Sequence, residues 1–352
     1  IIMMAKRPRI YEYLREQRDI WMSMSFSTMD VLAGAISAYI LLGVVEKCPW
    51  ILSIFPILLS VRGAGNGVFT GVLTTSLHIG TIEPRVRGNT QNYYSLIAAI
   101  FVISTTNSFI ATILVGIYFG DMVIAVMTLF VMMLSMVLTV SFSIITTSIV
   151  SFYAFTHGLD PDSIVYPVMA TLNDIVLSIF LILSILVIRP WSPRRSLVLG
   201  TAITISIILI TILIIWRRSS DDFFIKTIRE GMIGAIYVIV ISSISGIVLT
   251  MRYDVLNKFR NYMVVLPLLM TMSGGLGSIL LSKFTTKLNI GEIDLRSPLT
   301  VINFLLYSLS VCLPPFTVLI IMCSTIVGLA MSMSITPLMG FIVDVLIMGY
   351  QA

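Results

Sequence analysis

Apolar runs about as long as a membrane is thick follow one another along most of this chain. A helix needs roughly 20 apolar residues to cross a bilayer, and such runs recur from about Ser27 to the C-terminus. Charged residues make up 11% of the 352 residues, whereas roughly a quarter of a soluble domain is charged. The runs also lack the alternating pattern of barrel strands. The sequence therefore predicts an all-α polytopic membrane protein.

We expect about eleven transmembrane helices and two amphipathic helices at the membrane surface. The amphipathic helices are expected at 9–24 and 223–230. The spans are expected at 27–45, 51–79, 93–119, 122–155, a fifth that ends near 188, 197–216, 232–251, 262–284, 299–313, 316–331 and 335–350. With the N-terminus in the cytoplasm, the inside segments carry about twice as many Lys and Arg as the outside ones. We therefore expect a multi-pass plasma-membrane protein in that orientation.

A glycine-rich segment occurs twice in the chain. PILLSVRGAGNGVFTGVLTTSLHIG begins at Pro56, and PLLMTMSGGLGSILLSKFTTKLNIG begins at Pro267. The spacing predicts a first half at 1–190, a linking span at 191–218 and a second half at 219–352. Each half is an amphipathic helix followed by five spans. Because the linking span restores the direction of the chain, we expect two parallel five-helix repeats about an axis along the membrane normal.

A carboxylate lies inside the last apolar run of each half. Asp174 follows Pro167 by seven residues, and Asp344 follows Pro337 at the same distance. An acid at the centre of a membrane helix costs roughly 2.5–3.5 kcal/mol on insertion scales, so such acids usually serve a function. The repeat predicts that both meet near the axis as a paired polar site. The alternative is a buried carboxylate that bonds a neighbouring Ser or Thr and holds helices together.

Two acids with backbone carbonyls and hydroxyls such as that of Thr171 suit Mg²⁺, which prefers oxygen ligands. They suit zinc or copper poorly, because no Cys or His lies alongside. Gly63 and Gly274 permit either close helix packing or unwound backbone whose carbonyls face a cation. Asp30 is placed either at the membrane surface or where cations enter or leave the pathway. Arg62 would either balance an acid or extend towards the interface.

These motifs resemble the membrane domain of MgtE-type magnesium channels, and more closely their two-repeat eukaryotic solute-carrier relatives. The resemblance rests on HGLDPDSIVYPVMATLND from His157 to Asp174, and on the two glycine-rich segments. It implies a magnesium pathway in which Asp174 and Asp344 bind the ion. The family's glycine-asparagine pair is Gly63-Ala64 here, and Asn66 is the candidate substitute. The second half lacks the DPD turn, and Arg62 stands where those relatives have lysine.

The leading hypothesis is a divalent cation transporter or channel, most of all for magnesium, and not an enzyme. An intramembrane aspartyl protease also needs two aspartates, but its glycine-rich GxGD pattern is not that of LNDI or FIVDV. A non-transporting membrane subunit of the same fold is the third class. We expect no cofactor besides the transported ion. The partners are the lipid bilayer and the cation, and the net charge of +5 is too scattered for nucleic acid. A monomer suffices for a pore, and a homo-oligomer stays open.

Overall fold

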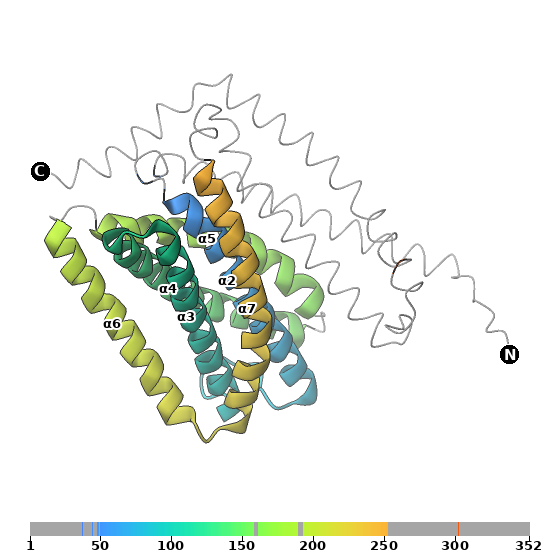
Figure 1. Ribbon diagram of the computed structural model, residues 1–352. Coiled ribbons are helices and arrows are strands. Elements are labelled where there is room, and N and C mark those ends of the chain that lie inside the picture. The colour runs from blue at the N-terminus through green and yellow to red at the C-terminus, as the bar shows by residue number, and fades with distance from the viewer. Residues whose placement is uncertain are drawn as a thin grey trace, which may run out of the picture.

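Six helices make up the part of the chain that the structure describes. This computed structural model describes residues 51–157, 161–188 and 193–252, together with the single residues 37, 44, 48, 50 and 302. Figure 1 shows the helices as one bundle, with α6 along one side. They are α2 (Ile51–Ile79), α3 (Gln91–Phe119), α4 (Met122–Thr156), α5 (Pro161–Ile188), α6 (Pro193–Arg218) and α7 (Asp222–Met251).

The lengths and compositions of these helices are those of an integral membrane protein. Among the described residues, α2, α3, α4, α6 and α7 are long and apolar enough to cross a bilayer, and α5 contributes a shorter apolar stretch, Thr171–Val187. The exposed faces of α6 and α7 are rich in large apolar side chains. Trp216, at the end of α6, is 78% exposed, and tryptophan is enriched at membrane–water interfaces.

The helix ends follow the sequence locally. Gly80 and Gly120 close α2 and α3 in the left-handed conformation, with φ of 80° and 64°, which glycine adopts without steric cost. Asp121 begins α4 by accepting a hydrogen bond from the N–H of Val123 at 2.8 Å. Such caps satisfy backbone groups that the first helical turn leaves without partners. Residues 80–90 connect α2 to α3, whereas only Gly120 and Asp121 connect α3 to α4. His78 and Phe155, near the ends of α2 and α4, are in contact, so these two helices run in the same direction.

α2 lies at the centre of the bundle and packs against α3, α4, α5 and α7. Two glycines allow the close approach of its neighbours. A Cβ atom on Gly65 would lie 3.0 Å from Ser104 Oγ of α3. A Cβ atom on Gly246 of α7 would lie only 2.1 Å from the carbonyl oxygen of Ser53. No side chain fits at that distance, so the crossing of α2 and α7 requires glycine at position 246.

The expected spans agree closely with the described helices, with one difference in α7. The segment 223–230 is not a separate amphipathic helix, because α7 runs without a break from Asp222 to Met251. Phe224 is fully buried and packs with Ala99 and Val102 of α3. Gly231, at the expected junction, stays helical and lies against Ile103. Burial against α3 therefore holds these first turns in the bundle rather than on a membrane surface.

Several predictions fall on other parts of the chain. The N-terminal amphipathic helix lies outside the described residues, as do the first span and the spans after residue 252 apart from the single residues 37, 44 and 302. The same holds for the second glycine-rich segment and for Asp344. The eleven-helix arrangement and the two parallel repeats therefore stay predictions, while the all-α membrane architecture is confirmed for the described helices.

Candidate functional site

An ion pair joins the middles of α2 and α5. Arg62 Nη2 contacts Asp174 Oδ1, and the two residues are only 8% and 3% exposed. The other charged residues of the described helices lie towards helix ends, and those furthest inside, Arg229 and Glu230 of α7, are exposed. Charged groups inside membrane helices are rare, and they mark ion or substrate pathways or pair with one another. This pair is therefore the first candidate for a functional site.

Amide and hydroxyl groups form a second polar feature between the same helices. Asn173, next to Asp174, donates from Nδ2 to Ser143 Oγ at 2.9 Å. Ser143 donates in turn to Asn66 Oδ1 at 3.3 Å, and Thr147 donates to the same oxygen at 3.4 Å. We call these four residues the polar seam. It connects α2, α4 and α5 through oxygen-rich groups of the kind that hard cations prefer.

Beyond the polar seam, further hydroxyl groups follow along α2 and α4 towards the end of the bundle where α3 begins. Thr70 and Thr74 follow Asn66 at four-residue spacing, and Ser151 follows Thr147 on α4. All three hydroxyls are buried, and none has a hydrogen-bond partner among the described residues. Buried polar groups are nearly always bonded to protein or to water. This continuation is therefore suited to binding water or a hydrated ion.

The backbone at Asp174 is tied to two serines. Its carbonyl oxygen accepts from Ser178 Oγ at 3.0 Å and from Ser37 Oγ at 3.3 Å. Ser178 lies one turn further along α5, whereas Ser37 belongs to the segment expected to be the first span. The position of Asp174 is thus fixed by hydrogen bonds from two parts of the chain.

The structure brings some of the predicted site residues together. Asp174 and Asn66 lie in the same region, linked through Asn173 and Ser143. Thr171 is half-buried on α5, almost one turn before Asp174. The predicted site residues Asp344, Gly274 and Asp30 lie outside the described residues.

Gly63 follows Arg62 on α2 and is half-buried. A Cβ atom there would meet no atom of the described residues within 4 Å. Helix packing within this part of the protein therefore does not require glycine at position 63. At Gly65, which faces α3, a Cβ atom would instead lie tight against Ser104 Oγ.

Sequence reasoning missed the α4 side of the site. Ser143 and Thr147 were not singled out, and neither was Asn173. A signal was present, because α4 carries a hydroxyl at every fourth position along one face: Ser135, Thr139, Ser143, Thr147 and Ser151. Residues at that spacing share a face of a helix, and such a stripe inside an apolar span indicates a polar interface.

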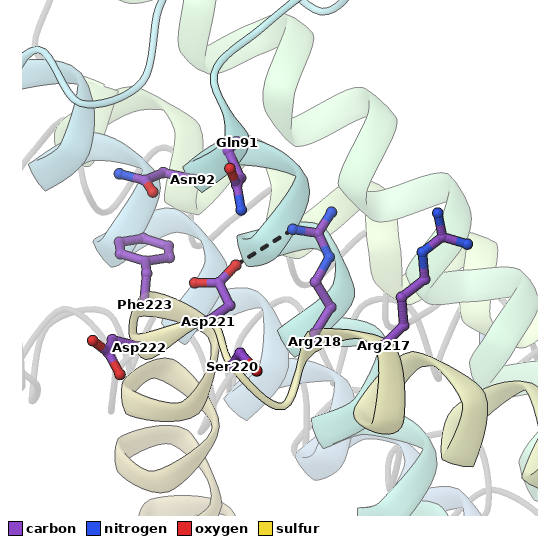
Figure 2. Close-up of a pocket in the computed structure, with 8 residues that line it drawn as sticks. All are labelled: Gln91, Asn92, Arg217, Arg218, Ser220, Asp221, Asp222 and Phe223. Atoms are coloured by element: carbon purple, nitrogen blue, oxygen red, sulfur yellow. Dashed lines mark hydrogen bonds and ion pairs between the residues drawn. The ribbon is translucent and has the colours of Figure 1, made fainter.

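A separate pocket of about 540 Å³ lies where α6 turns into α7. Figure 2 shows Arg218, at the end of α6, with its guanidinium directed towards the carboxylate of Asp221. The pocket is lined by Gln91, Asn92, Arg217, Arg218, Ser220, Asp221, Asp222 and Phe223. Ser220 and Asp221 lie in the turn between the candidate membrane spans 197–218 and 222–251, and the other lining residues lie at the ends of candidate spans.

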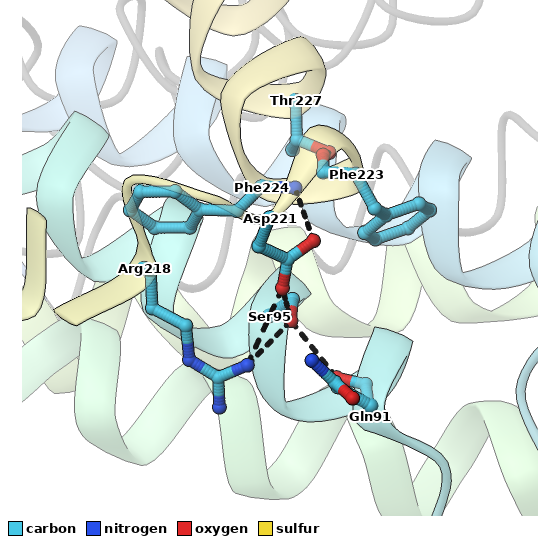
Figure 3. Close-up of polar contacts among 7 residues, drawn as sticks. All are labelled: Gln91, Ser95, Arg218, Asp221, Phe223, Phe224 and Thr227. Atoms are coloured by element: carbon cyan, nitrogen blue, oxygen red, sulfur yellow. Dashed lines mark hydrogen bonds and ion pairs between the residues drawn. The ribbon is translucent and has the colours of Figure 1, made fainter.

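Asp221 is the centre of the hydrogen bonds at this turn (Figure 3). Its carboxylate accepts from Ser95 of α3, from the N–H of Phe224 at 3.2 Å and from Arg218 at 3.3 Å. Burial alone would raise the pKa of Asp221, but these hydrogen bonds and the charge of Arg218 lower it below its ordinary value. The cluster ties the α6–α7 turn to α3, so its role is structural.

The described residues contain no group of three or more His, Cys, Asp or Glu side chains able to hold a metal ion. The acid inside the bundle is Asp174, and its neighbours are amides, hydroxyls and one guanidinium. A bundle of long apolar helices is typical of an integral membrane protein, in which charged groups at mid-helix mark ion or substrate pathways or pair with one another.

Residues 55–185 match the family model of MgtE, described as divalent cation transporter. The match begins inside α2 and ends inside α5, so it includes Arg62, Asp174 and the polar seam. It supports a divalent cation transporter, which is a transport class rather than an enzyme class. No curated protein sequence and no solved structure matches the chain. The closer resemblance to the eukaryotic solute-carrier relatives stays a prediction.

Proposed function

We propose that this protein transports divalent cations, magnesium first among them, and that Asp174 binds the ion inside the bundle. The observation that carries the proposal is a buried carboxylate at mid-helix, within the segment that matches a divalent cation transporter family. Mg²⁺ gives up its water reluctantly and is usually held by one or two carboxylates with waters kept. The amides and hydroxyls of the polar seam are suited to bind such waters.

The remaining parts of the site belong to the same proposal. Asp344 would supply the second carboxylate from the other half, and Asn66 would supply an amide oxygen from α2. Two parallel halves in a plasma membrane, with the N-terminus in the cytoplasm, would bring the two acids together. Further contributions to the pathway are proposed for Thr171, Gly63, Gly274 and Asp30.

One observation favours a second candidate, a membrane subunit of the same fold that transports nothing. The guanidinium of Arg62 already neutralises Asp174, so the described part of the site carries no net charge to attract a cation. A permanent structural ion pair would look the same. Measured flux separates the two candidates.

The test is uptake of Mg²⁺ by liposomes that contain the full chain and an enclosed magnesium-sensitive dye. We expect Asp174→Asn and Asp344→Asn each to reduce uptake roughly tenfold or more, since one charged ligand is typically worth a few kcal/mol. The matched control is Asp121→Asn at the start of α4, because asparagine is an equally good N-cap. It should transport as the parent does. Unchanged uptake in Asp174→Asn would remove the proposed site, and no uptake by the parent would favour the non-transporting subunit.

A further inference from the structure

The proposed cation ligand already has a positive charge against it. Arg62 Nη2 of α2 contacts Asp174 Oδ1 of α5, and both residues are buried. A guanidinium keeps its proton at every physiological pH. It can therefore leave the carboxylate only by moving away, and never by becoming neutral.

A guanidinium and a divalent cation compete for the same lone pairs. Arginine binds a carboxylate through N–H groups directed at the oxygens, and Mg²⁺ binds those same oxygens. Two positive charges a few ångströms apart also repel each other strongly where water is scarce. Occupation of Asp174 by the ion and by Arg62 is therefore close to mutually exclusive.

We propose that Arg62 is a tethered counter-ion, which keeps the cation site neutral while it is empty and which the arriving divalent cation displaces. The inference rests on the proposed function, and it assigns a means of regulation to the same site. A protein whose site is mostly blocked binds its ligand more weakly, in proportion to the fraction of molecules in which the site is open. Arg62 thus sets the cation concentration at which transport begins.

The polar seam offers the displaced guanidinium other acceptors. Asn66 lies one turn from Arg62 on the same face of α2, and the two hydrogen bonds that its Oδ1 accepts from the described residues are long, at 3.3 and 3.4 Å, so the guanidinium can replace these donors. Asn173 Oδ1, next to Asp174, is buried without a hydrogen-bond donor among the described residues. Amide oxygens accept from arginine without adding charge, so the guanidinium stays hydrogen-bonded when the cation takes the carboxylate.

The test is equilibrium binding of Mg²⁺ to the purified full chain in lipid nanodiscs. We expect Arg62→Gln to lower the apparent Kd roughly tenfold or more, the common size of a coupling between two ligands. Arg62→Lys keeps a positive charge that competes with Mg²⁺, so its apparent Kd should stay within roughly threefold of the parent's. The matched control is Arg85→Gln, because Arg85 also pairs with an acid, Glu83, but in an exposed loop. Its Kd should not change.

A second measurement uses the unaltered chain, so it does not depend on the folding of any variant. Infrared difference spectra on addition of Mg²⁺ should shift the guanidinium and carboxylate bands together. The guanidinium shift should be absent in Arg62→Lys, which assigns it to that side chain.

Three outcomes overturn the inference. If Arg62→Gln binds Mg²⁺ no more tightly than Arg85→Gln, the ion pair is a permanent structural contact. If the carboxylate bands shift in the parent without the guanidinium band, the cation binds without displacing Arg62. Neither of these two results would contradict the proposal that Asp174 binds the cation. If the parent binds no Mg²⁺, the proposed function fails together with this inference.

Discussion

Arg62 and Asp174 form a buried ion pair across α2 and α5, near the middle of both helices. A charge buried in an apolar bundle is costly without a partner, and in this pair each charge compensates the other where water is excluded. It also makes the two side chains interdependent. Removing one partner of a buried pair leaves the other charge uncompensated, which is destabilising by about 3–5 kcal/mol.

A double-mutant cycle on this pair is the first prediction. Without Mg²⁺, Arg62→Gln and Asp174→Asn should each lower the free energy of unfolding in detergent by several kcal/mol, and the double variant should lose clearly less than the sum. The exposed pair Arg85 and Glu83 is the control cycle, with a coupling of about 0–1 kcal/mol. Additive losses at Arg62 and Asp174 would contradict the pairing.

The second prediction concerns the polar seam at Ser143. Its hydroxyl accepts from Asn173 and donates to Asn66, so Ser143→Ala removes the hydrogen-bond acceptor of Asn173 Nδ2 and leaves Thr147 as the donor to Asn66 Oδ1. We expect a loss of about 1–3 kcal/mol in the free energy of unfolding, together with reduced Mg²⁺ uptake. Ser141→Ala is the matched control, because Ser141 is exposed and bonds its own helix at Val137. Equal effects at the two positions would show that the seam contributes nothing.

The spans of this bundle could be predicted well, because apolar length and turn residues are local properties. The run 51–79 agrees with α2 at both ends, and Gly80 marks the end of that helix. The exception is α7, where charged residues at its start suggested a surface helix. Burial of Phe224 against α3 decides that segment, and burial depends on a neighbour distant in the sequence.

The site could be predicted only in part. Asp174 stood out because a lone acid in an apolar run is costly in itself. The pairing with Arg62 could be named only as one alternative, since it depends on how α2 and α5 face each other. The amide of Asn173 gave no signal, because it follows from the contact with Ser143 on α4. Whether Asp344 joins this site stays a prediction.

The crossing of α2 and α7 gives the third prediction. A Cβ atom on Gly246 would lie 2.1 Å from the carbonyl oxygen of Ser53, so Gly246→Ala must push the helices apart. We expect a loss of about 1–3 kcal/mol or more, measured by thermal unfolding in detergent. At Gly234 of the same helix, a Cβ atom meets no atom of the described residues within 4 Å. Gly234→Ala should be neutral or should stabilise by up to about 1 kcal/mol. Tolerance of alanine at 246 would contradict this packing.

The fourth prediction is a pH dependence of stability at Asp221. Its folded-state pKa is lowered, because hydrogen bonds from Ser95 and Phe224, and the guanidinium of Arg218, outweigh the opposing effect of burial. The other charged groups lining this pocket are Arg217 and Asp222. The unfolded chain, with an ordinary aspartate pKa of about 3.9, therefore takes up the proton first as the pH falls. The ionised carboxylate thus stabilises the protein above that pH, and the contribution is lost as the pH falls through the folded-state pKa.

Asp221→Asn keeps a capping oxygen but carries no charge, so it isolates this contribution. Its unfolding temperature should lie below that of the parent at pH 7, and the difference should shrink as the pH falls below about 4. Arg218→Gln should reduce the same pH dependence, because it removes the guanidinium that favours the ionised form. The opposite result is a difference in unfolding temperature between the parent and Asp221→Asn that stays constant down to a pH at which Asp221 is protonated in both the folded and the unfolded parent. It would show that the charge of the carboxylate plays no part in holding the α6–α7 turn against α3.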